Sequence, residues 1–475
     1  MKTILTHRST AFLAFMALGM AVTAGACGDD TATSSSATSS SSSGGTAGSG
    51  GTGGSGGSGG PGGSGGAGGG MTGAPDLDPA FMWYGDNMKN LDTFIDSVGV
   101  NSPTYDDKNK PIAIFDWDNT VIKNDIGDLV TFWMINNDKI LQPPNKNWAN
   151  TSQFLTSNAR NALAAACGPL ADPGMPLPTS TNAACADEII SIYYDGKTTQ
   201  NQTAFAAWNY RRMEPAYAWT AQLQAGYTPA EVSEFGKQAL EAALLAAEGD
   251  TQTVGTRTMN AWTRVYDQIK NLISVMQSNG FDVWVVSASS QPIVEAFAAK
   301  VEIAADHVIG IRNVVDANGK LEYNFQGCGD VPDGKNDGMG SVTGNSMITY
   351  IDGKRCWINK VIYGDTTANA VNQTANAALR PVFGAGDSDT DITFLKDATG
   401  LKLALNRNKA EIMCNAYNNY QGKWLINPMF IGPKTKAATY PCSTTACKDE
   451  AGVSGPCLDE NGNVIADQED MVFAP

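Results

Sequence analysis

The sequence predicts an α/β fold: a Rossmann-like, doubly wound parallel sheet as the core, with a mainly helical cap inserted after the first core strand. Three observations predict it. Apolar runs of the buried-strand kind occur at 112–115, 282–286, 308–315, 381–385 and 401–405. Helix patterns separate these runs, and strands that alternate with helices form parallel sheets. The stretch between the first two runs is too long for one crossover helix, so we expect it to hold the cap.

The beginning of the chain predicts an export signal that takes no part in the fold. Lys2 and Arg8 precede an apolar run at 11–22, and small residues then lead to Cys27. We therefore expect residues 1–26 to be a lipoprotein-type signal peptide, with Cys27 lipidated after cleavage. The alternative is a simple signal peptidase site near Ala26. The apolar run is shorter than a membrane-spanning helix requires.

The next segment, residues 27–75, is composed almost entirely of small residues and predicts a Gly/Ser-rich disordered linker. The folded domain is expected at 76–475, with the cap at about 124–270 and a cysteine-containing tail at about 415–475. The expected location is exported: lipid-anchored to the cell membrane or cell surface, otherwise periplasmic or secreted. The lipid anchor would then be the only contact with a membrane.

The numbers of cysteines and histidines and the net charge narrow the class of protein. The chain has nine cysteines, and eight remain without Cys27, which is enough for four disulfides in an oxidising compartment. Their pairing stays open. No cysteine spacing matches a zinc-ligand pattern, and there are only two histidines, His7 in the signal segment and His307. The net charge of −16 argues against nucleic acid or an anionic membrane surface as a direct partner.

The end of the first core strand is the most informative part of the chain. Asp116 and Asp118 follow the run at 112–115, and Thr120 comes two residues later. Carboxylates that converge at the end of a buried strand repel each other, so the arrangement is costly unless a cation or a reacting phosphate lies there. The alternative for this segment alone is a strand end followed by an ordinary polar turn.

Three further segments supply matching groups. The strand at 282–286 ends on Ser287, whose hydroxyl and neighbouring backbone N–H groups can hold a phosphoryl oxygen. A lysine is expected to add positive charge, with Lys360 as the first choice and Lys354 as the alternative. The strand at 381–385 leads through glycine into Asp387 and Asp391, which are hard oxygen ligands suited to Mg²⁺. A rival segment at 364–369 lacks the second acid.

Together and in this order, the four segments resemble the haloacid dehalogenase-like superfamily of aspartate-nucleophile hydrolases, over roughly residues 85–430. The resemblance implies that Asp116 forms an aspartyl-phosphate and that Asp118 is the general acid and base. Dehalogenating relatives lack a carboxylate at the Asp118 position, so a phosphatase is favoured. The remaining roles implied are phosphate binding by Thr120, Ser287 and Lys360, and Mg²⁺ binding by Asp116, the backbone carbonyl of Asp118, Asp387 and Asp391.

The cap is expected to select the substrate. Thr228 and Glu231 form a capping box that predicts a helix start in the cap. The string at 116–125 resembles phosphoserine phosphatases, in which an acid near the Asp125 position meets the substrate amine, and phosphorylcholine phosphatases share a similar motif. Aromatic faces beside a carboxylate suit a quaternary ammonium. The expected head-group residues are Asp125, Trp208, Tyr210, Glu214, Tyr217 and Trp219, and the alternative is that these aromatics only pack in the cap.

The expected function is therefore a Mg²⁺-dependent phosphomonoesterase for a small phosphorylated amine or choline compound, such as phosphorylcholine, phosphoethanolamine or phosphoserine. The alternative is a non-catalytic surface lipoprotein that keeps the fold as a binding module. A binding module has no need for both Asp116 and Asp118, so the paired acids favour the enzyme.

Overall fold

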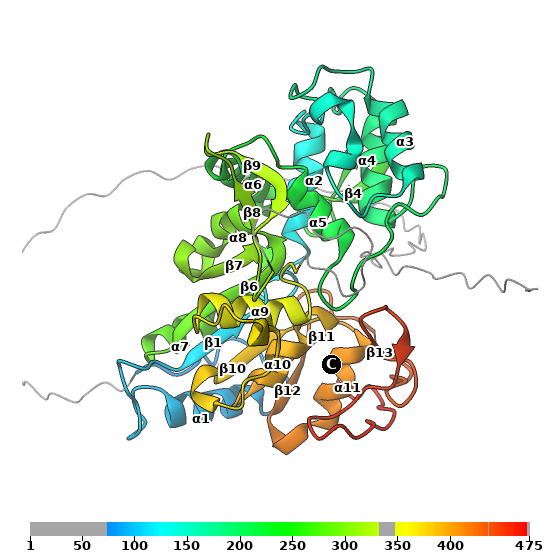
Figure 1. Ribbon diagram of the computed structural model, residues 1–475. Helices are drawn as coiled ribbons and strands as arrows, with labels where there is room; N and C mark the ends of the chain where they lie inside the picture. The colour runs from blue at the N-terminus through cyan, green and yellow to red at the C-terminus, as the bar shows by residue number, and fades with distance from the viewer. Residues whose placement is uncertain (1–73, 332–346, 436, 473–475) are drawn as a thin grey trace, which may run out of the picture.

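The computed structural model describes residues 74–331, 347–435 and 437–472 (Figure 1). The predicted signal peptide, Cys27 and nearly all of the predicted linker lie outside these residues. Within the described ranges, every helix is too short or too polar to traverse a lipid bilayer.

The core is a six-stranded sheet in the order β12-β11-β10-β1-β6-β7. Every neighbouring pair in it is parallel, which confirms the predicted fold class. The strands are β1 (Ile112–Phe115), β6 (Asp282–Ser290), β7 (Val308–Ile311), β10 (Phe383–Gly386), β11 (Lys402–Asn406) and β12 (Trp424–Pro428).

Helices cover this sheet, as Figure 1 shows in its lower half. Helix α1 packs against β12, α7 and α9 against β6, α10 against β10, and α11 against β11 and β12. Strand β1 lies in the middle, and its residues Ala113, Ile114 and Phe115 are completely buried. The core helices are α1 (Asn87–Val98), α7 (Asp267–Ser278), α8 (Gln291–Ala298), α9 (Asp352–Val361), α10 (Ile392–Asp397) and α11 (Ala410–Asn418).

The long segment between β1 and β6 is mainly helical, as predicted, and stands above the sheet in Figure 1. Two short strands, β2 (Ile122–Lys123) and β5 (Arg264–Val265), pair at its base. The capping box predicted at Thr228 begins α6, so the side chains of Thr228 and Glu231 bond each other's backbone N–H groups. The cap contains α2 (Ile126–Asn136), α3 (Ser157–Cys167), α4 (Ala183–Asp195), α5 (Pro215–Gln222), α6 (Pro229–Leu245) and the ribbon β3 (Thr251–Val254) with β4 (Arg257–Asn260).

Two features beyond the sheet and cap were incompletely predicted. The apolar run expected as one strand at 308–315 is divided, because the chain leaves the sheet after β7 and forms β8 (Asn313–Val315), which pairs with β9 (Leu321–Phe325). In the tail, β13 (Cys447–Lys448) pairs with β14 (Ser454–Gly455). Four disulfides join all eight described cysteines: Cys167–Cys185, Cys328–Cys356, Cys414–Cys442 and Cys447–Cys457.

Candidate active site

Strand register brings the predicted acids together. Phe115 of β1 pairs with Ala385 of β10 on one side and with Val285 of β6 on the other. The residues that follow these three partners therefore leave the same edge of the sheet, the edge at which parallel sheets place their sites. Asp116 is held there by its own N–H, which donates to the Ala385 carbonyl at 2.9 Å.

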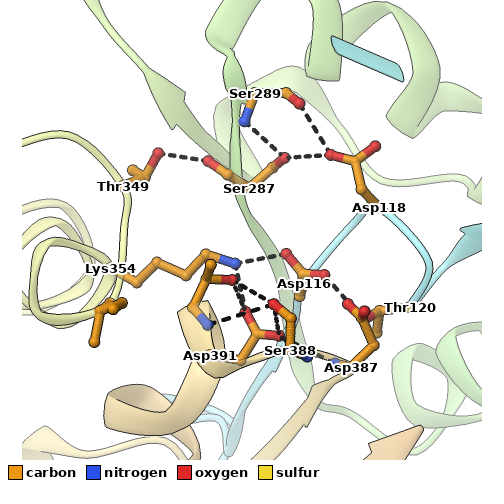
Figure 2. Close-up of polar contacts among 12 residues, drawn as sticks. Asp116, Asp118, Thr120, Ser287, Ser289, Thr349, Lys354, Asp387, Ser388 and Asp391 are labelled. Carbon is orange, nitrogen blue, oxygen red and sulfur yellow. Dashed lines mark hydrogen bonds and ion pairs between the residues drawn. The ribbon is translucent and has the colours of Figure 1, made fainter. Parts of the chain in front are cut away.

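The carboxylate of Asp116 has two polar neighbours. Lys354 Nζ donates to Asp116 Oδ1 at 2.5 Å and to Asp391 Oδ1 at 2.6 Å. Thr120 Oγ1 lies 2.9 Å from Asp116 Oδ2 and 3.2 Å from Asp387 Oδ1, so it bridges the two acids (Figure 2). Thr120 thus orients carboxylates in this structure, and its predicted contact with phosphate stays a prediction.

Asp391 fixes the loop that carries Asp387. Its Oδ2 accepts the N–H groups of Asp387 and Ser388, both at 3.0 Å. A Cβ on Gly386 would lie 2.6 Å from the Cβ of Asp391, so only glycine lets the strand end approach this acid so closely. The glycine predicted to permit close approach of the backbone therefore makes room for Asp391.

Asp118 faces a different set of groups from Asp116. Its Oδ2 accepts the hydroxyls of Ser289 at 2.9 Å and Ser287 at 3.3 Å, and its Oδ1 accepts the Ile126 N–H at 2.8 Å (Figure 2). Because Ile126 is the first residue of α2, the Asp118 carboxylate lies at the amino end of that helix. Ser287 is itself held, since its carbonyl accepts the Thr349 hydroxyl at 2.5 Å.

Burial sets the protonation of these groups. It raises the pKa of the Asp118 carboxyl well above its ordinary value, and the charges of Asp125 and Asp116 add to the rise. Burial and Asp391 likewise raise the pKa of Asp116, although Lys354 opposes them. For Lys354, burial lowers the pKa but the two partner carboxylates outweigh it and raise the pKa above the ordinary lysine value. Lys354 is therefore charged at neutral pH.

Three of the acids could hold a divalent cation. One carboxylate oxygen from each of Asp116, Asp387 and Asp391 lies within 4.8 Å of the other two, and all three residues are buried. Their paired cations are Lys354 and Arg407, whose guanidinium donates to Asp387 Oδ2 at 2.7 Å. Three carboxylates and two basic groups leave an excess negative charge, and hard oxygen ligands suit Mg²⁺, so these residues fit the metal. The carboxylate of Asp118 lies outside this trio, and the metal contact expected for its backbone carbonyl stays a prediction.

The lysine expectation needs a correction. Lys360, the first choice, does not reach the acids, because its Nζ donates to the Gly327 carbonyl at 2.5 Å and lies over the Trp357 ring. Lys354, the alternative, is completely buried between Asp116 and Asp391. Both lysines belong to α9, and only the one in its first turn points at the site.

The predicted head-group residues are not all in one place. Asp125 caps α2 by accepting the Asp128 N–H, and it lies close enough to Asp118 for their charges to interact. Trp219 is completely buried in the cap, where its indole N–H donates to Thr151 Oγ1 at 2.9 Å. For Trp219, packing in the cap was therefore the right alternative, because its ring contacts those of Trp148 and Phe205.

The other aromatics form a separate cluster. The rings of Tyr210 and Tyr217 contact that of Tyr350 with centroids 6.2 Å and 6.0 Å apart, while Trp208 packs partly buried against the core. Lys448 of the tail places its Nζ 4.8 Å from the centre of the Tyr210 ring. Its charge also acts on Glu214, which caps α5 and whose pKa is raised by burial to about 7. A cation from the chain itself therefore lies on this cluster.

Sequence reasoning missed several polar residues at the site. Ser289 lies two residues beyond Ser287 in β6, and the alternation of side chains along a strand could have indicated it. Arg407 follows β11 directly, and Lys123 follows the acidic motif in β2. In the sequence, both basic residues resemble ordinary solvent-exposed charges, and nothing in the neighbouring residues marks them as part of a site.

Comparison with known proteins gives a family match over part of the chain. Residues 198–343 match the family model described as haloacid dehalogenase-like hydrolase. The matched range includes Ser287 but neither Asp116 nor Asp387. No curated protein matches the chain. The match and the parallel sheet confirm that the chain resembles a haloacid dehalogenase-like hydrolase.

Solved structures are similar to the chain at low sequence identity. The chain is similar to a conserved protein of unknown function from Anaerococcus prevotii DSM 20548, with 20% identity and a TM-score of 0.50 over 71% of this chain and 91% of that one. A protein of unknown function from Bordetella pertussis Tohama I has 12% identity and a TM-score of 0.39, over 68% and 99% of the two chains. A substrate-bound phosphoserine phosphatase has 13% identity and a TM-score of 0.27, over 62% and 86%.

Proposed function

We propose that this chain, which resembles the haloacid dehalogenase-like hydrolases, is a Mg²⁺-dependent phosphomonoesterase that acts through an aspartyl-phosphate. The observation that carries the proposal is the convergence of Asp116, Lys354, Asp387 and Asp391 at the carboxyl edge of the sheet, beside Asp118. Phosphoryl transfer depends on positioning and charge stabilisation, and these residues supply both.

In the first step, an oxygen of Asp116 attacks phosphorus and the bond from phosphorus to the alcohol oxygen breaks. Asp118 gives its proton to the departing alkoxide, and its raised pKa suits this role. In the second step, Asp118 takes a proton from water, and the water attacks the aspartyl-phosphate to release inorganic phosphate and Asp116.

The remaining groups stabilise charge. Lys354 and the Ser287 hydroxyl hold the oxygens of the transferring phosphoryl group, and Lys354 also fixes the position of Asp116. Asp116, Asp387 and the backbone of Asp118 would hold Mg²⁺, and Asp391 would align Asp387 through its backbone N–H. When bound, the metal supplies the positive charge that lets a carboxylate approach an anionic phosphate.

The proposed substrate is a small phosphorylated amine or choline compound. Asp125 supports an ammonium group close to the leaving oxygen, because its charge acts on Asp118 at the start of α2. The aromatic cluster of Tyr210, Tyr217 and Glu214 remains a predicted second position for a cation. Lys448 lies there in this structure, so a substrate cation would have to displace it.

The proposed location is outside the cytoplasm. Four disulfides are typical of proteins from oxidising compartments. Lipidation of Cys27 is part of the proposal, and its test is loss of the protein from the membrane fraction when Cys27 is replaced by alanine.

The test of the function is metal-dependent hydrolysis of p-nitrophenyl phosphate by the purified protein. Activity should disappear with a chelator and return with Mg²⁺. Mg²⁺ should also raise the Tm of the wild type but not that of Asp387→Asn, because the metal stabilises only the folded protein that can bind it. Asp365→Asn, in the rival segment, is the matched control and should respond like the wild type. Hydrolysis that is indifferent to the chelator would contradict the proposal.

A further inference from the structure

Lys123 is a buried lysine whose ammonium has no partner among the described residues. Only 6% of it is exposed, and no hydrogen bond or ion pair joins its ammonium to any of the residues that the structure describes. Burial and the neighbouring charge of Arg407 lower the pKa of Lys123 to about 8, against the opposing attraction of Asp387. An ammonium buried in this way is unfavourable unless an anion lies beside it, so Lys123 indicates a binding position for an anion.

Arg407 provides a second cation at the same place. It follows β11 and donates to Asp387 Oδ2 at 2.7 Å, while its charge also acts on Asp125, Asp128 and Lys123. Its side chain keeps 24% of its surface exposed, so it borders open space beside the site. A lysine and an arginine are therefore near each other, and the charge of Asp387 acts on both.

The location of this pair separates it from the phosphoryl position. Lys354 forms ion pairs with Asp116 and Asp391, whereas Arg407 lies between Asp387 and the start of α2. The start of α2 is also where the Asp118 carboxylate accepts the Ile126 N–H. Since Asp118 protonates the leaving group, Lys123 and Arg407 border the alcohol part of the substrate.

The net charge of Lys123 and Arg407 indicates which chemical group they bind. Arg407 is paired with Asp387, so the pair offers about one unpaired positive charge, that of Lys123. A carboxylate carries one negative charge, whereas a second phosphate carries about two. We propose that Lys123 and Arg407 form a carboxylate subsite for the alcohol part of the substrate. The inference rests on the proposed phosphatase function.

Asp125 lies beside this subsite with the opposite charge. It can accept an ammonium group, while Lys123 and Arg407 accept a carboxylate. A phosphate ester of a small amino acid carries both groups, whereas phosphoethanolamine and phosphorylcholine carry only the cation. The geometry therefore selects the amino-acid ester among the three substrates expected from the sequence.

The test compares esters that differ by one charged group. With the wild type, kcat/KM for phosphoserine should exceed that for phosphoethanolamine by about tenfold or more, because each charged hydrogen bond contributes strongly to binding. The deamino analogue of phosphoserine, which keeps the carboxylate, should also be better than ethyl phosphate. Equal rates for the esters with and without a carboxylate would overturn the proposal, and this comparison needs no variant.

Variants then assign the effect to Lys123. In Lys123→Met the preference for phosphoserine over phosphoethanolamine, measured as the ratio of the two kcat/KM values, should fall by about tenfold. Lys123→Arg should keep most of the preference, and Lys270→Met, which removes an exposed lysine of α7, should keep all of it. Equal losses on both esters, or no loss on either, would reject the subsite.

Failure of the subsite is distinguishable from failure of the proposed function. If p-nitrophenyl phosphate is hydrolysed with Mg²⁺ but the carboxylate has no effect, the phosphatase stands and the subsite is wrong. If no ester is hydrolysed, the phosphatase itself is wrong, and the subsite falls with it.

Discussion

Asp116 and Asp118 are two residues apart in the chain, yet their carboxylates have no partner in common. Asp116 is bound to Lys354 and Thr120, whereas Asp118 is bound to two serine hydroxyls and the start of α2. The chain leaves β1 at Phe115, so the alternation of a strand no longer forces the two side chains to one face. Asp116 therefore belongs to the trio that could hold a metal, whereas Asp118 is separate from it and, in the proposed mechanism, faces the leaving group.

This division of roles predicts different defects for the two acids. Asp116→Asn should lower kcat by at least roughly a thousandfold on every ester, because no nucleophile remains. Asp118→Asn should still release p-nitrophenol in a burst, since this leaving group needs no proton, and should then stall at the phosphorylated enzyme. Rapid-quench kinetics measure the burst. Activity of Asp116→Asn close to that of the wild type would contradict the nucleophile assignment.

The two lysines of α9 give a matched pair of variants. Lys354→Met should lower kcat/KM for p-nitrophenyl phosphate by roughly a hundredfold or more, because a buried positive charge beside the reacting groups is lost. Lys360→Met should keep activity within about threefold, since its ammonium binds the Gly327 carbonyl and lies over the Trp357 ring rather than beside the acids. The thermal midpoint of each variant checks that it is folded. The reverse order of the two defects would refute the placement of Lys354.

The acids and Ser287 could be predicted because each follows the end of a strand, which is a local property of the sequence. The lysine could not be fixed in this way, because six residues of helix correspond to a rotation of about 240° between Lys354 and Lys360. The apolar neighbours do not decide between the two lysines either, because Trp357 lies three residues from each of them.

At the scale of elements, local pattern predicted the central strands closely and the edges less well. The strand expected at 112–115 is β1 without change, and the one at 401–405 is β11 displaced by one residue. Strand β12 was not predicted, because it is a short edge strand that ends on Pro428. Whether an edge strand forms depends on the strand beside it. A short run of sequence carries no information about that neighbour.

The amino end of α5 predicts a pH effect on stability. The pKa of Glu214 is about 7 in the folded protein against an ordinary value of 4.5, so the folded state holds this proton more tightly than the unfolded chain. The free energy of unfolding should therefore fall as pH rises from about 5 to about 7, by on the order of 2 kcal/mol after allowance for partial exposure. Glu214→Gln should remove this fall.

Urea unfolding of Glu214→Gln at several pH values measures the effect. The matched control is Glu241→Gln, an exposed position on α6, which should keep the wild-type pH dependence. The glutamine can still accept the Ala216 N–H, so the cap of α5 is retained. If the free energy of unfolding of Glu214→Gln depended on pH as that of the wild type does, ionisation of the Glu214 carboxyl would not be what destabilises the folded protein.

At the scale of the whole molecule, the tail joins the cap to the core. Tyr210 N–H donates to the Glu450 carbonyl at 2.7 Å, and Arg212 forms an ion pair with Glu450 at 3.1 Å. Arg211 joins the same hairpin to Asp352 and Glu411 of the core. The cap segment 210–212 is thus held from two sides, which fixes it beside the segment that carries Lys354.

Oxidation of the cysteines to disulfides changes the mass of the chain by a measurable amount. Four disulfides predict that the exported protein is lighter than its reduced form by eight hydrogens, as intact-mass spectrometry can determine. Peptide mapping should return the pairs of this structure. Alkylation of eight free thiols in exported protein would contradict both the disulfides and the proposed location.

The disulfide pattern has a consequence for the order of synthesis. The eight described cysteines pair in consecutive order along the chain, the first with the second and so on to the seventh with the eighth, over separations of 18, 28, 28 and 10 residues. As the chain emerges from a translocation channel amino end first, an oxidant that joins every second thiol to the one released just before it forms only native pairs. No later cysteine has to compete for an earlier one. Such a chain can mature without an isomerase to exchange mispaired bonds.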